Sequence, residues 1–571
     1  MKKVLTCLFT VGAILSVSAQ ERNFGQLSGN FQTDLQYYLR DSLIDPSGEA
    51  YPDERLLGTG VLNLTYNLGD FIAGVRYENY QNNRVGLPPG YQGEGITYRY
   101  ARFIRDGYDI TVGNFYEQFG SGLILRAYEE RGLGFDNNLD GLRVVFSPAK
   151  GLTFKGIIGR QRNYFDKSNS VVRGFDSEWS IGNSLGWKGN TNLIIGAGVT
   201  SKFQEYNSSS LNYPKNVAAA AGRINLTTND LNIYAEYAYK GNDPSADNSQ
   251  IYKPGHALYM TTSYTKGGLG LTGGIKYYDN FSYRSEPFTD PQQLLIGYLP
   301  SLTTLHTYSL PALYSYNTVF SGEQGYQLEA FYRVPRKSLL GGKYGATVTL
   351  SYSESYSLNK TYTPRYEDGD TAMASPILDG TDGYTTEFGV GPYKYFHDFH
   401  IEIKKTLSKK WKATATYYNF YFNNDAIRKG TAGVYDYNLI STDVEPHAFK
   451  VNAAVLELLY KIKPRHSIRG EFQALFTDGQ DGTFGGDWGL VLLEYSIAPK
   501  WFFAVQDAYN FGNNIKDLQI HYVSVNMGYT MGTTRFQFGY GRQQQGVFCV
   551  GGICRVVPAS NGFSLGITSN F

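Results

Sequence analysis

The stretch NGFSLGITSNF (residues 561–571) alternates apolar and polar side chains up to a last aromatic residue. Successive side chains of an extended strand point to opposite faces of the sheet. The apolar face of this stretch carries Phe563, Leu565, Ile567 and Phe571. Chain ends that lack partners are usually frayed and polar. We therefore expect this segment to be a strand that pairs along its whole length.

The same alternation recurs throughout the chain. It is clearest in VLNLTYNL (61–68), FIAGVRYEN (71–79), DLNIYAEYAYK (230–240), FHIEIK (399–404) and RFQFGY (535–540). A period of two means that each strand has one apolar face and one polar face. The composition agrees, because 49 Tyr, 34 Phe and 65 Gly are typical of strands, turns and interfacial aromatic residues. The sequence therefore predicts an all-β protein.

The first twenty residues, MKKVLTCLFTVGAILSVSAQ, have the layout of a secretory signal peptide. Lys2 and Lys3 precede an apolar run, and small residues lead up to Ala19, after which we expect cleavage. A membrane anchor is disfavoured because the run is short and a polar segment follows. No later stretch reaches the ~20 apolar residues of a spanning helix. We therefore expect a signal peptide at 1–19 and a single exported domain at 20–571.

The connections between the expected strands alternate in length. Short turns occur at 67–70, 106–107, 148–151 and 266–268, and longer polar loops at 41–55, 80–93, 242–255, 284–320, 357–388 and 424–445. This alternation is typical of a transmembrane β-barrel with short periplasmic turns and long extracellular loops. Lipid tolerates no unpaired backbone, so such a sheet must close on itself.

Counting strands between these connections gives a single large antiparallel barrel of about 24 strands, with both termini on the short-turn side. The alternative is 22 strands, because 139–148 need not span and 173–186 could be a loop or lumen segment. In either case the last strand is expected to pair with the first, near 25–40.

The ending resembles the C-terminal recognition signal of bacterial outer-membrane proteins. The likeness lies in Phe571, the alternating apolar residues and Gly566 five places earlier, whereas Ser569 stands where an aromatic residue is usual. The resemblance implies that the barrel assembly machinery reads this strand during insertion.

The densest group of charges lies in YEQFGSGLILRAYEERGLGFDNNLDGLRV (116–144). Its candidate functional side chains are Glu117, Arg126, Glu129, Glu130, Arg131 and Asp136. They either narrow and polarise a pore from inside or form a salt-bridged lid over the barrel mouth. The spacing of Leu123, Ala127 and Glu130 also permits a short helical turn. We hypothesise that Arg126, Glu129 and Arg131 set ion selectivity.

Other candidate sites are weaker. His397 and His400 are three residues apart on an expected strand, so their imidazoles face opposite ways and shared metal ligation is disfavoured. The loops at 379–383 and 478–482 lack the register of a calcium site and are better explained as turns. With no nucleophile motif or nucleotide-binding loop, the sequence predicts no enzyme, no cofactor and no metal.

Two cysteines flank a Gly551-Gly552 pair in FCVGGICR (548–555). A two-residue hairpin turn at these glycines would place Cys549 opposite Cys554. Cross-strand cysteines can form a disulfide, and an exported chain meets an oxidising compartment. We expect this bond to form and to stiffen the last long loop.

Taken with the signal peptide and the tyrosine-rich barrel, the block at 117–143 resembles a family of uncharacterised Bacteroidota outer-membrane proteins. The resemblance implies an outer-membrane location and a barrel, but no particular activity. A TonB-dependent transporter is disfavoured because strands begin near residue 25, which leaves no room for its separate N-terminal plug domain.

Two functions are expected on these grounds. The first is a porin-like channel or transporter for small solutes. The alternative is a non-conducting barrel subunit of a larger envelope complex, in which loops 284–320 and 357–388 bind partner proteins or lipoproteins. Outer-membrane lipid is an expected partner in both cases. The net charge of +1 gives no basis for binding nucleic acid.

Overall fold

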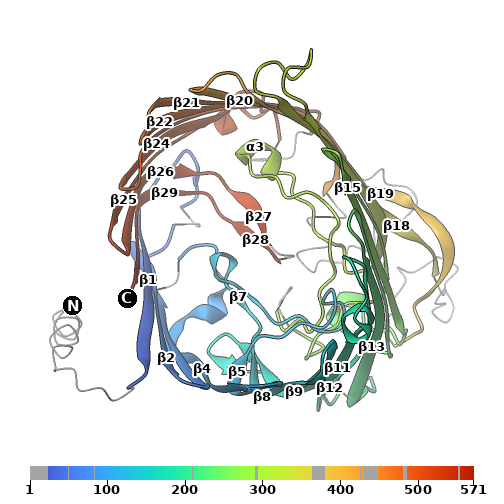
Figure 1. Ribbon diagram of the computed structural model, residues 1–571. Coiled ribbons are helices and arrows are strands. Elements are labelled where there is room, and N and C mark those ends of the chain that lie inside the picture. Colours follow the sequence, from blue (N-terminus) through green and yellow to red (C-terminus); the bar gives the residue numbers. More distant parts are fainter. Residues whose placement is uncertain are drawn as a thin grey trace, which may run out of the picture.

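The alternating segments pair as antiparallel neighbours into a sheet that closes on itself, as seen along the barrel axis in Figure 1 of the computed structural model. The structure describes residues 24–48, 51–82, 84–208, 211–289, 293–362, 380–424, 427, 448–479, 485–550 and 553–571. The expected signal peptide at 1–19 lies outside these residues. Within them, no helix has the length and apolar character needed to cross a membrane.

The wall is built from 24 strands. The first twelve are β1 (Gln26–Tyr38), β2 (Leu56–Leu68), β3 (Phe71–Asn82), β4 (Gly93–Arg105), β5 (Tyr108–Phe115), β8 (Leu139–Ala149), β9 (Leu152–Asn163), β11 (Val171–Ser180), β12 (Asn192–Phe203), β13 (Asn216–Thr227), β14 (Leu231–Lys240) and β15 (Gly255–Lys266). The other twelve are β16 (Leu269–Asp279), β17 (Glu323–Val334), β18 (Ala346–Tyr362), β19 (Tyr384–Thr406), β20 (Trp411–Asn423), β21 (Ala448–Lys463), β22 (His466–Thr477), β23 (Trp488–Ile497), β24 (Trp501–Asn510), β25 (His521–Met531), β26 (Thr534–Gln543) and β29 (Ser560–Asn570).

Short elements lie outside the wall. They are the strands β6 (Glu129–Glu130), β7 (Phe135–Asp136), β10 (Asp166–Lys167), β27 (Gly546–Val550) and β28 (Ile553–Val557), the helices α2 (Ile181–Leu185) and α3 (Ser309–Ala312), and the 3-10 turns η1 (Pro89–Tyr91), η2 (Arg131–Leu133), η3 (Ala246–Asn248) and η7 (Lys516–Leu518). β10 pairs only with β9, so it does not add a strand to the closed wall.

The barrel closes where the sequence predicts. β29 pairs on one side with β26 and on the other with β1, from Asn30 opposite Asn570 to Tyr38 opposite Gly562. Gly29 and Phe571 add a pair of backbone hydrogen bonds of 2.7 and 3.0 Å. The prediction of 24 strands is confirmed, because both doubtful segments supply wall strands, namely β8 and β11.

The two ends of the barrel differ. The 11 connections at the end that holds both termini are mostly tight turns, such as 69–70, 106–107 and 532–533. The 12 connections at the other end are mostly longer, and the longest covers residues 280–322. We call these the short-turn end and the long-loop end. This arrangement confirms the predicted parity.

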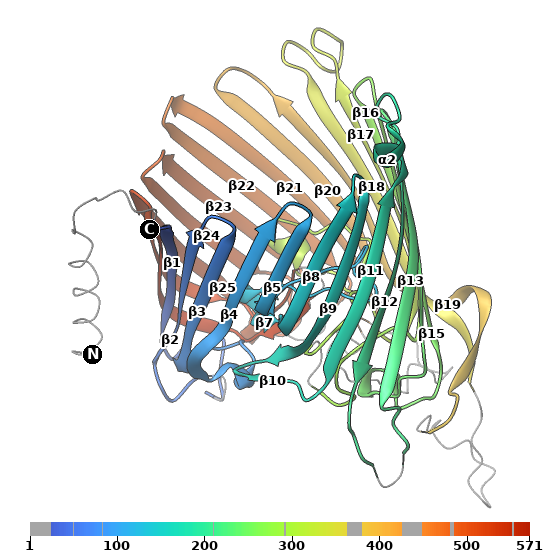
Figure 2. The same ribbon diagram turned by 60° about the horizontal axis from the view of Figure 1, so that its bottom comes forward.

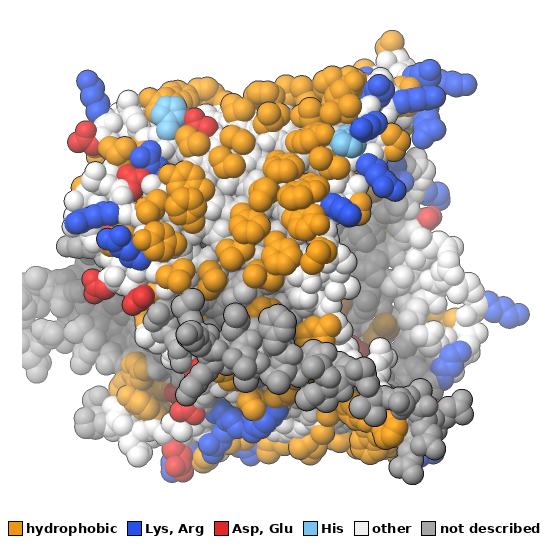
Figure 3. Space-filling view, turned by 90° about the vertical axis from the view of Figure 1, so that its left-hand side faces the viewer, with side chains coloured by type: hydrophobic (Ala, Val, Ile, Leu, Met, Phe, Trp, Pro, Cys, Tyr) orange, Lys and Arg blue, Asp and Glu red, His pale blue; other side chains and the backbone are white. Residues whose placement is uncertain are grey.

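The outer face is apolar, as the alternation predicts. On β14, Tyr237 and Tyr239 are half exposed on the outside, whereas Glu236 and Lys240 are buried inside. Figure 3 shows such apolar side chains across one side of the wall, with Lys and Arg concentrated toward its edges. Among the apolar side chains exposed on the wall are Phe472, Val491, Leu493, Val505, Val525 and Phe538, each more than 40% exposed.

Part of the inner face is also apolar, which the sequence analysis did not predict. Tyr418, Phe420 and Phe422 of β20 all point inward and are at most 4% exposed. They belong to a cluster that continues over β21 to β25 and includes Trp488. These side chains are shielded from water because segments of the chain fold into the barrel and cover them.

Three such segments enter from the long-loop end and lie inside the wall (Figures 1 and 2). The first inner segment is residues 116–138, the second is 280–322, and the third is the hairpin formed by β27 and β28. The second differs from the sequence analysis, which counted 284–320 among the long extracellular loops; partner binding by this segment stays a prediction. Several of its leucines and tyrosines, among them Leu295, Leu299, Leu310, Tyr314 and Tyr316, are buried against the inner wall.

Candidate functional site

The first inner segment is anchored by an apolar side. Phe119, Leu123, Ile124 and Leu125 are at most 1% exposed and pack with small inward residues of the wall, among them Ala238. Alanine on the inner face leaves space for a covering segment, and burying such side chains contributes roughly 1.5–3 kcal/mol each. The helical turn that the spacing of Leu123, Ala127 and Glu130 permits does not form; the segment instead makes the β6–β7 pair with the 3-10 turn η2 between them.

Gly120 lets this segment approach the wall closely. Its φ is +54°, and a Cβ atom there would lie 2.7 Å from the Glu236 carboxylate oxygens and 2.9 Å from the Arg223 side chain. The next residue, Ser121, donates its backbone N–H to Glu236 at 2.7 Å. A larger residue at 120 would be strained and would push the backbone away from this carboxylate.

Three carboxylates of the segment and the wall are held by arginines. Asp136 accepts bonds from Arg76 of β3 at 3.0 Å and Arg162 of β9 at 2.8 Å. Arg162 also binds Glu78 at 2.6 Å, and Arg76 also binds Glu129 at 3.1 Å. The oxygens of Glu78, Glu129 and Asp136 lie within 4.8 Å of one another, but the guanidinium groups already supply the countercharge. This cluster is therefore a structural ion-pair network and not a metal centre.

A tyrosine and a second ion-pair group complete the polar side of the segment. Tyr116 donates its hydroxyl to Asp136 at 3.1 Å, and burial raises the pKa of this phenol well above its usual value, so it stays a donor. Glu117 accepts from Arg143 at 2.6 Å and from Lys155 at 3.0 Å. The segment is thus fixed to the wall by charges of both signs.

The first and second inner segments are joined to each other. The guanidinium of Arg126 lies 4.1 Å from the ring centre of Tyr128 and 3.9 Å from that of Tyr298. The backbone N–H of Arg126 donates to the carbonyl of Ile296 at 2.8 Å, and that of Tyr298 donates to Gly122 at 2.9 Å. The two segments therefore form one layer inside the barrel.

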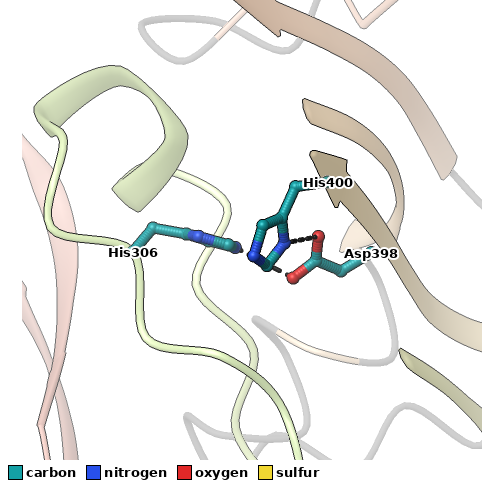
Figure 4. Close-up of side chains that lie close together, drawn as sticks. All are labelled: His306, Asp398 and His400. Carbon is teal, nitrogen blue, oxygen red and sulfur yellow. Dashed lines mark hydrogen bonds and ion pairs between the residues drawn. The ribbon is translucent and has the colours of Figure 1, made fainter. Parts of the chain in front are cut away.

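The second inner segment runs from β16 across the lumen to the far wall. Near its start, Arg284 pairs with Asp247. Farther along, the backbone N–H of Leu310 donates to Gln473 of β22 at 2.9 Å. Between these points the imidazole of His306 meets two residues of β19, Asp398 and His400 (Figure 4).

Asp398 bridges the two histidines. Its two carboxylate oxygens lie 3.0 Å from Nε2 of His306 and 3.1 Å from Nδ1 of His400. The sequence analysis predicted that His397 and His400 face opposite sides of the strand, and they do. His400 meets Asp398, whereas Nδ1 of His397 lies 3.4 Å from the carboxylate of Glu354. The sequence analysis did not include His306, whose partners lie 92 or more residues downstream.

A cavity of about 210 Å³ lies between the first inner segment and strands β1 to β3. Glu129 and Arg131 face it from the segment, and Gln32, Asp34 and Thr59 from the wall. Arg131 is held by Glu129 at 2.8 Å and by Gln32 at 3.3 Å. Charges of both signs therefore border the space that the segment leaves beside the wall.

The structure places all six predicted charges inside the barrel. Glu117 and Asp136 are buried in ion pairs, Arg126 stacks between tyrosines, and Glu129 and Arg131 border the cavity. Glu130 is half buried. Their position is that of a lumen segment, whereas a lid at the mouth was the alternative. Their role in selectivity stays a prediction.

Two other predictions concern the end of the chain. β27 and β28 pair with Cys549 directly opposite Cys554, as predicted, but the side chains of this hairpin and the turn at 551–552 lie outside the described residues. The disulfide stays a prediction.

The C-terminal strand carries the other prediction. Gly566 pairs with Asp34 where the last strand meets the first, and recognition of Gly566 and Phe571 by the barrel assembly machinery stays a prediction.

The fold and the inner segments define a class: a closed 24-stranded antiparallel barrel whose lumen is partly filled by its own loops. The chain belongs to the family described as "Family of unknown function (DUF6029)", whose profile matches residues 1–571. Comparison with curated proteins finds no match.

Solved structures with a similar fold are distant. The siderophore receptor PirA from Pseudomonas aeruginosa is 11% identical, with 97% of this chain and 82% of that chain covered and a TM-score of 0.40. The P pilus usher (PapC) translocation pore is 9% identical, with 95% and 98% covered and a TM-score of 0.42. OccD3 (OpdP) from Pseudomonas aeruginosa is 12% identical, with 86% and 96% covered and a TM-score of 0.33. Likenesses this low support no argument about function.

Proposed function

We propose that this protein is an outer-membrane barrel that lets small solutes pass through a lumen narrowed by its inner segments. An apolar outer face on a closed sheet is the form that lipid requires, because no backbone group is left unpaired against hydrocarbon. Export by the signal peptide at 1–19 and insertion through the C-terminal strand belong to the same proposal.

One observation carries the proposal: the inner face is polar and water-accessible toward the short-turn end. The side chains of Glu178 and Lys404 point inward there and are 39% and 60% exposed. Asn526 and Gln537 also point inward and are exposed. Toward the long-loop end, the inner segments replace this open space with the charged cavity at Glu129 and Arg131. We interpret these features as a vestibule that leads to a selective constriction.

Planar-bilayer recording of the purified barrel tests this proposal. We expect discrete conductance, with Arg131→Gln shifting selectivity toward cations and Glu129→Gln shifting it toward anions. Arg99→Gln is a matched control, because Arg99 lies on the outer face and is 54% exposed. A folded barrel with no conductance would contradict the proposal, and equal shifts in all three variants would remove the role of the constriction.

A second candidate is a non-conducting subunit of an envelope complex. It is favoured by the two apolar clusters that the inner segments form with the wall, since both fill lumen space with dry side chains. Partner lipoproteins would then bind at the long-loop end. Recovery of stoichiometric partners from mild detergent, together with absent conductance, would support this candidate over the first.

A further inference from the structure

We propose that His306, Asp398 and His400 bind a divalent transition metal of the zinc class inside the barrel. Figure 4 shows the three side chains converging from two parts of the chain, the second inner segment and β19. One ligand atom from each lies within 4.8 Å of the other two. Bond lengths of about 2.0–2.2 Å around zinc put neighbouring ligand atoms about 3.3 Å apart. The two imidazole nitrogens lie 3.0 and 3.1 Å from different oxygens of Asp398, so the three ligand groups are already in direct contact.

The surroundings distinguish this cluster from the carboxylate networks of the barrel. In the described part of the chain, Asp398 forms its ion pairs with the two imidazoles and with no lysine or arginine. Its side chain is 1% exposed, and those of His306 and His400 are 4% and 8% exposed. Two imidazoles and one buried carboxylate are ligands suited to zinc, copper or nickel, and a divalent ion bound there would supply positive charge beside the carboxylate.

The three side chains are surrounded by aromatic rings and by one buried serine. The His306 ring lies 4.9 Å from that of Tyr418 and 5.1 Å from that of Phe420. Ser353 of β18 is directly opposite Asp398 in the ladder, is buried, and its Oγ has no hydrogen-bond partner in the described residues. Three protein ligands leave a fourth position for water, and such a water would have this hydroxyl as a nearby acceptor.

The loop that carries His306 lies at the edge of the solvent-accessible space. The residues on either side of His306, Leu305 and Thr307, are exposed, so the loop that carries the imidazole borders solvent. Because His306 belongs to the second inner segment and its partners belong to the wall, the metal would fasten the segment to β19. This site does not depend on whether the barrel conducts.

Metal binding by the full-length folded barrel in detergent tests the proposal. After equilibrium dialysis against Zn²⁺, elemental analysis is expected to find one tightly held equivalent. His306→Ala and Asp398→Asn are each expected to weaken binding at least about tenfold. His397→Ala is the matched control, because that residue is on the same strand but faces away, and it is expected to bind as the parent does. A difference in gel migration between unheated and heated samples shows that each variant is folded.

Co²⁺ provides a second measurement that does not depend on stability. We expect the d–d absorption of cobalt bound to nitrogen and oxygen ligands in the parent and in His397→Ala, and its loss in His306→Ala and Asp398→Asn. Folded parent protein that holds no zinc would overturn the proposal. Equal zinc binding in the parent and both cluster variants would also overturn it, since the metal would then be elsewhere.

Discussion

Buried arginines inside the barrel each hold more than one carboxylate. Arg162 binds Glu78 and Asp136, and its side chain is 4% exposed. Arg223 binds Asp176 through two bonds of 2.7 Å and Glu178 at 2.9 Å. Removing one member of a buried pair leaves the other charge without a partner, so these residues should be sensitive to truncation.

Arg162→Ala is therefore expected to lower the free energy of unfolding by about 3–5 kcal/mol, because the buried carboxylates of Glu78 and Asp136 then share the single guanidinium of Arg76. Arg99→Ala is the control: Arg99 is 54% exposed and its partner Asp140 keeps Lys167 as a second cation, so a smaller loss is expected. Urea unfolding of the barrel in lipid vesicles measures both. Similar losses in the two variants would contradict the structural role of the buried network.

Asp41 gives a pH prediction at the closing seam. It follows β1 and accepts hydrogen bonds from Arg542 of β26 and from Asn561 of β29. Burial alone would raise the pKa of Asp41, but the bonds from Arg542, the Leu43 N–H and Asn561 lower it below the usual 3.8. A lowered pKa in the folded state stabilises the fold above pH 3.8, and this contribution is lost as the pH falls through the lowered value.

The measurement is the difference in unfolding free energy between the parent and Asp41→Asn. It should be constant from neutral pH down to about 5 and shrink below pH 3.8, where the parent loses its carboxylate contribution. A difference that grows as the medium becomes more acidic would contradict this assignment.

At the scale of elements, the second inner segment is separable from the wall. β16 and β17 pair directly from Leu269 opposite Tyr332 to Tyr278 opposite Glu323, so the sheet does not need the connection between them for its ladder. The segment instead covers the apolar inner face of β20 and β21.

Replacing residues 300–318 with a short Gly-Ser linker is expected to leave a folded barrel that is less stable, because the side chains of Phe420 and Phe422 become exposed to water. If the proposed channel is correct, conductance should rise. Gel mobility without heating, urea unfolding and bilayer recording measure the three properties. Loss of the folded form would show that the segment is needed for closure, contrary to the pairing of β16 with β17.

The β27–β28 hairpin carries the remaining element-scale prediction. Cys549 lies opposite Cys554 in the ladder. We expect the mature protein to have a mass about 2 Da below that of the dithiol form and to gain this difference on reduction, because opposed cysteines in an oxidising compartment form disulfides. Two free thiols in unreduced protein would show that the hairpin is held by backbone pairing alone.

At the scale of the whole molecule, the apolar outer face predicts a requirement for surfactant or lipid. Residues such as Phe472, Leu493 and Val505 are about half exposed on the outside, far beyond the apolar patches of soluble monomers. The mature chain should aggregate when refolded in buffer alone and fold in detergent micelles or vesicles. A monodisperse folded chain in buffer would contradict a membrane-spanning wall.

The wall could be predicted from the sequence because each strand repeats a local rule. Glu236 and Tyr237 are neighbours on a strand, so their side chains must point to opposite faces of the sheet, and Glu236 is buried inside whereas Tyr237 is exposed outside. The interior could not be predicted in the same way. In β20 both faces are rich in aromatic residues, and nothing local shows that Phe420 and Phe422 face a covered lumen. One signal was present: LPALYSY (310–316) is too apolar for a loop in water.

The second inner segment contacts residues far downstream in the sequence, and this has a consequence for the order in which the barrel is assembled. Leu310 docks on a residue 163 positions later in the chain, and His306 on one 92 positions later. Contacts between such remote positions form slowly, so the strands that provide these docking points must be in place first. The newly inserted barrel then has a water-filled lumen for a time. Docking of the second inner segment, which excludes this water from the apolar inner face, is the last step. Trp488, fully buried against this layer, should report that final step as a late fluorescence change after the strands have formed.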